Sequence, residues 1–73
     1  MQFMQAQDAA ELLRMEFAEM PGLLLTFWQA RRLCNLSEEL CAGALGMLTQ
    51  SGFLVQTRDG CYRRPHPERS TAA

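Results

Sequence analysis

The stretch from residue 35 to residue 52 constrains the fold of this chain more than any other part of the sequence. Ser37 is placed to cap a helix, and Glu38 and Glu39 suit the positive end of the helix dipole. At 3.6 residues per turn, the apolar positions that follow form one inward stripe: Cys41, Ala44, Leu45 and Leu48. Gly52 ends this helix. The pattern therefore predicts a turn, a capped amphipathic helix and a glycine stop.

A first helix and a short extended segment are predicted upstream of this stretch. Asp8 and Glu11 have the spacing of a capping box, which places the start of the first helix directly after Asp8. Pro21 and Gly22 end that helix, because proline restricts the residue before it and glycine permits a turn. Leu23–Leu25 is too short for a helix. We expect it to form an extended segment that pairs with a later hairpin.

A second helix is predicted between this segment and the turn. Thr26 and Gln29 form another capping box, which opens a helix through about Cys34. Asn35 suits the left-handed position that ends it. Three aromatic side chains are expected in the core rather than at a ligand site: Phe17, Trp28 and Phe53.

The residues after Gly52 predict a β-hairpin. The segment 53–57 alternates between apolar and polar residues, and Asp59-Gly60 is typical of a two-residue type I′ turn. With that turn, Thr57 lies opposite Tyr62. The side chains then expected on the core face are Phe53, Val55, Thr57 and Tyr62.

These elements predict an α+β, mainly helical fold, with a three-helix core and a C-terminal β-hairpin. The 73 residues suit a single domain, 1–73, with an ordered core at about 8–64 and a flexible tail at about 66–73. The longest apolar run, Leu23–Leu25, is far too short to cross a membrane, and residues 1–20 lack the pattern of a signal peptide. We therefore expect a cytoplasmic protein without membrane contact.

Composition argues against catalysis and metal binding. The three cysteines, Cys34, Cys41 and Cys61, are odd in number and, with His66, lack the paired spacings of a zinc site. Cys34 and Cys41 are better explained as small core residues. The sequence holds no glycine-rich phosphate loop and no paired-carboxylate motif. We expect a protein that is not an enzyme and has no cofactor, metal or small-molecule substrate.

The order of elements resembles the winged helix-turn-helix domains of bacterial transcription regulators. The residues that carry the resemblance lie within about 8–64: Leu36-Ser37, Cys41, Ala44-Leu45, Leu48, Gly52-Phe53-Leu54 and Asp59-Gly60. The resemblance implies that residues 37–51 form the helix that enters the DNA major groove and that residues 57–62 form the wing. It implies a DNA-binding, transcription-regulatory function with duplex DNA as the partner. Four arginines would contact the DNA backbone: Arg31, Arg32, Arg58 and Arg63.

The outward face of the third helix favours a second function. Base-reading helices present polar or basic side chains. Here the outward positions carry little charge and little bulk: Glu39, Leu40, Ala42, Gly43, Gly46, Met47 and Gln50. Two internal glycines cost a helix about 1 kcal/mol each, which a close-packed partner would offset. The alternative is therefore a protein-interaction or dimerisation module that uses this face, with a protein partner or a second copy of the chain.

Overall fold

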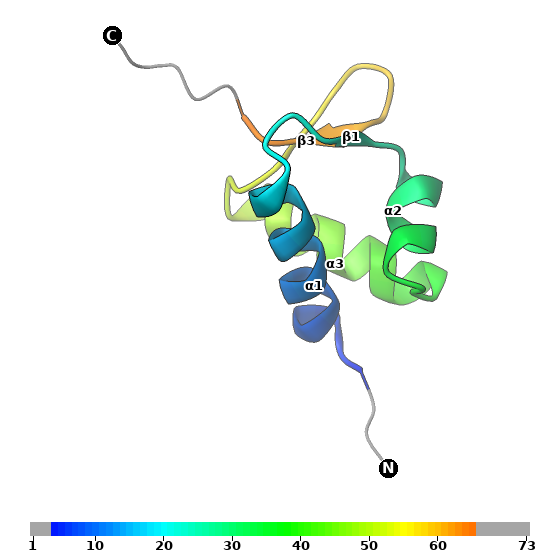
Figure 1. The fold of residues 1–73 in the computed structure, drawn as a ribbon. Helices are drawn as coiled ribbons and strands as arrows, with labels where there is room; N and C mark the ends of the chain where they lie inside the picture. The colour runs from blue at the N-terminus through cyan, green and yellow to red at the C-terminus, as the bar shows by residue number, and fades with distance from the viewer. Residues whose placement is uncertain (1–3, 66–73) are drawn as a thin grey trace, which may run out of the picture.

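The computed structural model describes residues 4–65, which form a small α+β domain that is mainly helical (Figure 1). Within these residues the elements follow the order α1 (Ala6–Glu19), β1 (Leu24–Leu25), α2 (Phe27–Leu33), α3 (Glu38–Gln50), β2 (Val55–Gln56) and β3 (Tyr62–Arg63). The strands form an antiparallel sheet with the order β1-β3-β2. This confirms the predicted fold class of three helices and a C-terminal hairpin. The tail predicted at about 66–73 lies outside the described residues.

Helix α1 begins before the predicted position. The backbone N–H of Gln5 donates to the Asp8 carboxylate at 3.0 Å, so Asp8 is the third helical residue that reaches back to the N-cap. The prediction that Asp8 is the N-cap, with Glu11 as its partner, is therefore wrong. The predicted end is correct: α1 ends at Glu19, directly before the turn that holds Pro21.

The two caps around α2 and α3 confirm the predicted turn between them. The hydroxyl of Thr26 accepts a hydrogen bond from the backbone of Gln29 at 3.1 Å, and the Gln29 side chain accepts one from the backbone of Thr26. Asn35 has a φ of 54°, and within residues 4–65 it is the only non-glycine residue with a positive φ. The hydroxyl of Ser37 then accepts from the N–H of Leu40 at 3.2 Å and opens α3.

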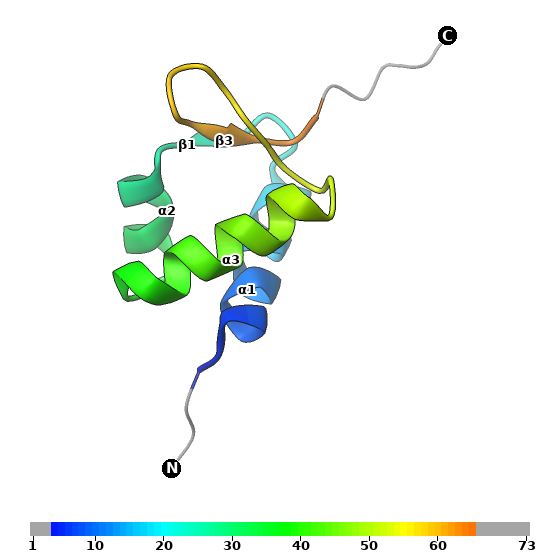
Figure 2. The same cartoon turned by 180° about the vertical axis from the view of Figure 1, so that it is seen from behind.

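The inward stripe of α3 is as predicted, and it packs mainly against α1. Figure 2 shows α3 crossing α1, with α2 beside the N-terminal half of α3 and the sheet at one end of the molecule. The buried core draws on all three helices and on the segments that follow α2 and α3: Ala9, Ala10, Leu13, Phe17, Ala30, Leu36, Cys41, Ala44, Leu45, Leu48 and Leu54. Phe17 is fully buried, as expected, and Phe53 is half-buried against this core.

The hairpin has a different turn from the one predicted. The Gly60 N–H donates to the Thr57 carbonyl at 3.0 Å, the Thr57 N–H donates to the Cys61 carbonyl at 2.8 Å, and Gly60 alone in the loop has a positive φ, of 86°. These bonds define a three-residue loop with a glycine bulge, whereas a type I′ turn needs a positive φ at Asp59 as well.

The longer loop shifts the strand register by one residue. Gln56, rather than Thr57, lies opposite Tyr62. A shift of one residue turns each side chain to the other face of a strand. Val55, expected in the core, is accordingly exposed, and Leu54 is fully buried in its place. The N–H of Leu54 also donates to the carbonyl of Leu48 at 3.1 Å, which ties this segment to the end of α3.

Candidate interaction surfaces

The outer surface of α3 is a narrow stripe of four exposed residues. Glu39, Ala42, Gly46 and Gln50 follow one another at helical spacing and are all exposed. Met47 beside them is 42% exposed. Beyond its chain neighbours and the backbone of its own helix, a Cβ built on Gly46 would meet no described atom within 4 Å, so this part of the helix is open. The stripe carries a carboxylate and an amide but no cation.

Two residues expected on this outer face are instead covered by other parts of the chain. Leu40 is half-buried and packs on the core. A Cβ built on Gly43 would lie 3.1 Å from the Cβ of Ala6, the first residue of α1. The prediction that Leu40 and Gly43 face outward is therefore wrong at both positions. The glycine at position 43 is explained by the close approach of α1, a contact within the chain.

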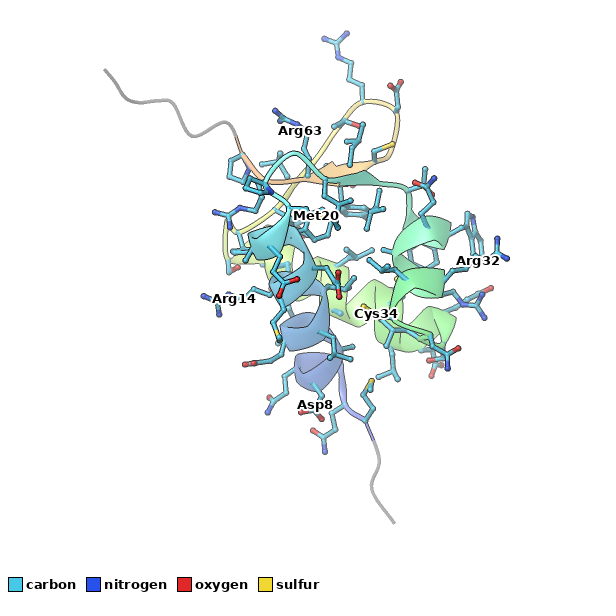
Figure 3. All side chains as sticks on the ribbon, in the orientation of Figure 1. Asp8, Arg14, Met20, Arg32, Cys34 and Arg63 are labelled. Atoms are coloured by element: carbon cyan, nitrogen blue, oxygen red, sulfur yellow. The ribbon has the colours of Figure 1, made fainter. Side chains whose placement is uncertain are left out.

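The four arginines predicted to contact the DNA backbone are dispersed. Arg58 is exposed in the hairpin loop, while Arg63 is half-buried in β3, between Leu24 and Val55 of the neighbouring strands. Figure 3 shows Arg63 above the sheet and Arg32 beyond the outer side of α2. Neither position belongs to the outer stripe of α3.

The outer side of α2 combines the only tryptophan of the chain with two arginines. Trp28 is 55% exposed, which overturns the expectation that it lies in the core. The guanidinium carbon of Arg31 lies 5.8 Å from the centre of the indole ring, a cation–π contact, and Arg32 is exposed one helical turn beyond Trp28. The rings of Phe27 and Trp28 pack edge to face, with their centres 5.0 Å apart. We call Trp28, Arg31 and Arg32 the tryptophan face.

The outer side of α1 has the opposite charge. Asp8, Leu12, Met15 and Glu19 follow one another at helical spacing on the side away from buried Leu13, and all four are exposed. Met15 is 57% exposed and Leu12 is 39% exposed. We call these four residues the acidic face. The sequence indicates this face, because Leu12 and Met15 are apolar residues on the otherwise polar side of an amphipathic helix.

Two further arginines hold an aromatic ring at the end of α3. The guanidinium carbons of Arg64 and Arg14 lie 3.8 Å and 5.3 Å from the centre of the Phe53 ring. Both guanidinium groups make cation–π contacts with the Phe53 ring. These contacts join Arg14 of α1 to Arg64, the residue directly after β3. This contact could not be predicted from the sequence, because the three residues are remote from one another along the chain.

A groove of about 740 Å³ lies between the α1–β1 turn and the hairpin. The side chains of Leu23 and Leu24 line one wall, and Cys61 and Arg63 line the other. Its walls are mainly apolar. The groove contains one of the predicted backbone-contacting arginines, Arg63.

The surroundings of the two cysteines in the helical region favour the neutral thiol. Burial is the main cause that raises the pKa of Cys34, and the nearby charge of Glu16 raises it further. Burial is also the main cause that raises the pKa of Cys41, and the nearby Cys34 raises it further. Cys41 is fully buried and Cys34 is half-buried between the helices (Figure 3). A raised pKa lowers the fraction of reactive thiolate. Within residues 4–65, no three histidine, cysteine or acidic side chains are grouped closely enough to hold a metal ion.

Comparison of the chain with protein-family models, curated proteins and solved structures gave no match. No helix in the described part of the chain has the length and apolar character needed to span a membrane. The surfaces themselves are therefore the basis for assigning a function.

Proposed function

We propose that this chain is a small, non-catalytic winged helix-turn-helix module that binds a protein surface rather than reading a DNA sequence. The winged-helix assignment is supported by the order of helix, short strand, helix, turn, helix and hairpin. It is also supported by the left-handed turn at Asn35 and by the pairing of β1 with β3 of the hairpin. The choice of a protein partner rests on what the exposed faces carry.

The exposed Trp28, with Arg31 and Arg32 one helical turn beyond it, is the observation that carries the proposal. Tryptophan and arginine are enriched among the residues that supply most of the energy at protein interfaces. Arg31 holds the indole through its cation–π contact, so part of the entropy cost of ordering this ring on binding is already met. A half-exposed aromatic ring in this setting favours contact with a partner that offers apolar and acidic groups.

The charge on α3 argues against base reading by that helix. In a winged helix the first turns of the third helix approach the DNA, where Glu38 and Glu39 would face phosphates. Two like charges 4 Å apart repel by about 1 kcal/mol even in water, and by more where water is excluded. Of the other outer positions, Ala42 and Gly46 offer no hydrogen-bonding side chain to a base edge, and the amide of Gln50 lies at the opposite end of the helix from these first turns.

Backbone-only DNA binding is the second candidate, because Arg32 and Arg58 are both exposed. It would rest on phosphate contacts, with each contact adding about −0.9 to the slope of log K against log salt concentration. The test is fluorescence anisotropy of a labelled random 25-base-pair duplex, titrated with the protein at several salt concentrations. We expect that neither Arg58→Ala nor Arg32→Ala weakens any binding to the duplex that is observed. Salt-dependent binding that either substitution abolishes would contradict the proposed function.

A further inference from the structure

We infer that the tryptophan face of one copy of this chain binds the acidic face of a second copy. The inference rests on the proposed function, since it names the protein partner. It makes Trp28, Arg31 and Arg32 of α2 one half of an interface and the outer residues of α1 the other half.

The two faces are complementary in chemistry. The tryptophan face offers a half-exposed indole with two guanidinium groups. The acidic face offers two exposed apolar side chains, Leu12 and Met15, with a carboxylate beyond each. A methionine sulfur beside an aromatic ring is a favourable contact, and guanidinium–carboxylate pairs fix orientation. The two faces therefore carry opposite charges, and each presents an exposed apolar group to the other.

The spacing of the residues also matches. Arg32 follows Trp28 by one helical turn, and Glu19 follows Met15 by the same interval. Four residues of helix rise about 6 Å, so both faces place charge and apolar group at the same separation. With the indole against Met15 and the two helices side by side in the same direction, the guanidinium of Arg32 meets the carboxylate of Glu19.

The arrangement produces a head-to-tail assembly. The tryptophan face belongs to α2 and the acidic face to α1, and Figure 3 shows Arg32 and Asp8 at separate edges of the molecule. A contact between different faces leaves one free face on each copy, so further copies add in the same way. The contact involves few residues and exposed charges, so we expect a Kd of about 100 µM that weakens with salt.

Two variants convert this assembly into a single measurable contact. Met15→Lys disables the acidic face and keeps Trp28, whereas Trp28→Ser disables the tryptophan face and leaves that protein without tryptophan. The emission of the Met15→Lys protein then reports one indole. Addition of the Trp28→Ser protein is expected to shift this emission to shorter wavelength and to saturate at one to one. The double variant Met15→Lys/Trp28→Ser is the matched control titrant, and it is expected to bind at least tenfold more weakly.

Equal shifts with both titrants, or no shift at millimolar Trp28→Ser protein, would overturn the inference. Sedimentation equilibrium of the unsubstituted chain gives a second readout that does not depend on either variant folding. Its average mass is expected to rise with concentration from 8.3 kDa to beyond that of a dimer. A constant monomer mass at millimolar concentration overturns the self-contact alone, whereas arginine-dependent duplex binding overturns the proposed function.

Discussion

The two glycines inside α3 provide a matched pair of substitutions, Gly46→Ala and Gly43→Ala. Gly46 faces open space, so an added methyl group there meets no described atom beyond its chain neighbours and the backbone of its own helix. Alanine is better than glycine in a helix interior by about 1 kcal/mol. Gly46→Ala is therefore expected to stabilise the fold by about 1 kcal/mol, which corresponds to a rise in Tm of about 4–8 °C for a domain of this size.

At Gly43 the same gain is opposed by a steric contact. The new methyl carbon would lie 3.1 Å from the Cβ of Ala6, and carbon atoms pack without repulsion at about 3.5–4.0 Å. Overpacking typically costs about 1–3 kcal/mol. Ala6 is the first residue of α1 and has little helix before it to resist a shift, so the cost falls at the lower end of that range. The two effects then cancel, and Gly43→Ala is expected to leave the stability nearly unchanged.

Urea denaturation followed by circular dichroism measures both substitutions. The double variant Ala6→Gly/Gly43→Ala completes a thermodynamic cycle, in which removal of the Ala6 methyl group should restore about 1 kcal/mol of coupling energy. A Gly43→Ala protein as stable as the Gly46→Ala protein would show that α1 does not approach α3 as described. It would also return position 43 to the outer surface that the sequence predicts.

Three further predictions concern caps, the hairpin and the thiols. Asp8→Ala is expected to lower the free energy of unfolding by about 1 kcal/mol and Glu11→Ala by less than about 0.5 kcal/mol, because only Asp8 reaches back to the N-cap. Urea titrations in which Glu11→Ala is the more destabilising substitution would refute this cap assignment. Gly60→Ala is expected to cost about 1–2 kcal/mol in the same assay, because its φ of 86° strains any side chain, and an unchanged midpoint would exclude the described loop. Burial raises the pKa of Cys34 and Cys41, so their contribution to stability is constant below pH about 8.5 and is lost at higher pH. The prediction is contradicted if the unfolding midpoint of a Cys34→Ser/Cys41→Ala protein falls between pH 8 and 10 as steeply as that of the unsubstituted protein.

The helices, and the caps of α2 and α3, could be predicted from the sequence because their causes are local. Thr26 and Ser37 accept hydrogen bonds from residues three positions away, and the buried stripe of α3 follows from helical periodicity. The start of α1 was missed because Gln5 is not a usual N-cap residue. In its place, the more typical Asp8 was assigned the cap.

Features that depend on contacts across the chain could not be predicted from periodicity. The helical pattern of α3 alone gives Gly43 an outward position, and only the approach of α1 covers it. Asp59-Gly60 is compatible with either a two-residue or a three-residue loop, and the burial of Leu54 decides between them. The exposure of Trp28 follows from the small interior that three short helices enclose, which Phe17 and several leucines already fill.

A residue-resolved NMR titration tests the central claim, that the outer faces of α1 and α2 bind protein and that α3 does not read DNA. Amide spectra are recorded on a concentration series of the chain, and random duplex DNA is then added at low salt. We predict concentration-dependent shifts at Leu12, Met15, Trp28 and Arg32, with no further change at α3 or the hairpin loop when DNA is added. Shifts along the outer stripe of α3 and at Arg58 on adding DNA, with the α1 and α2 faces unchanged throughout, would contradict the account.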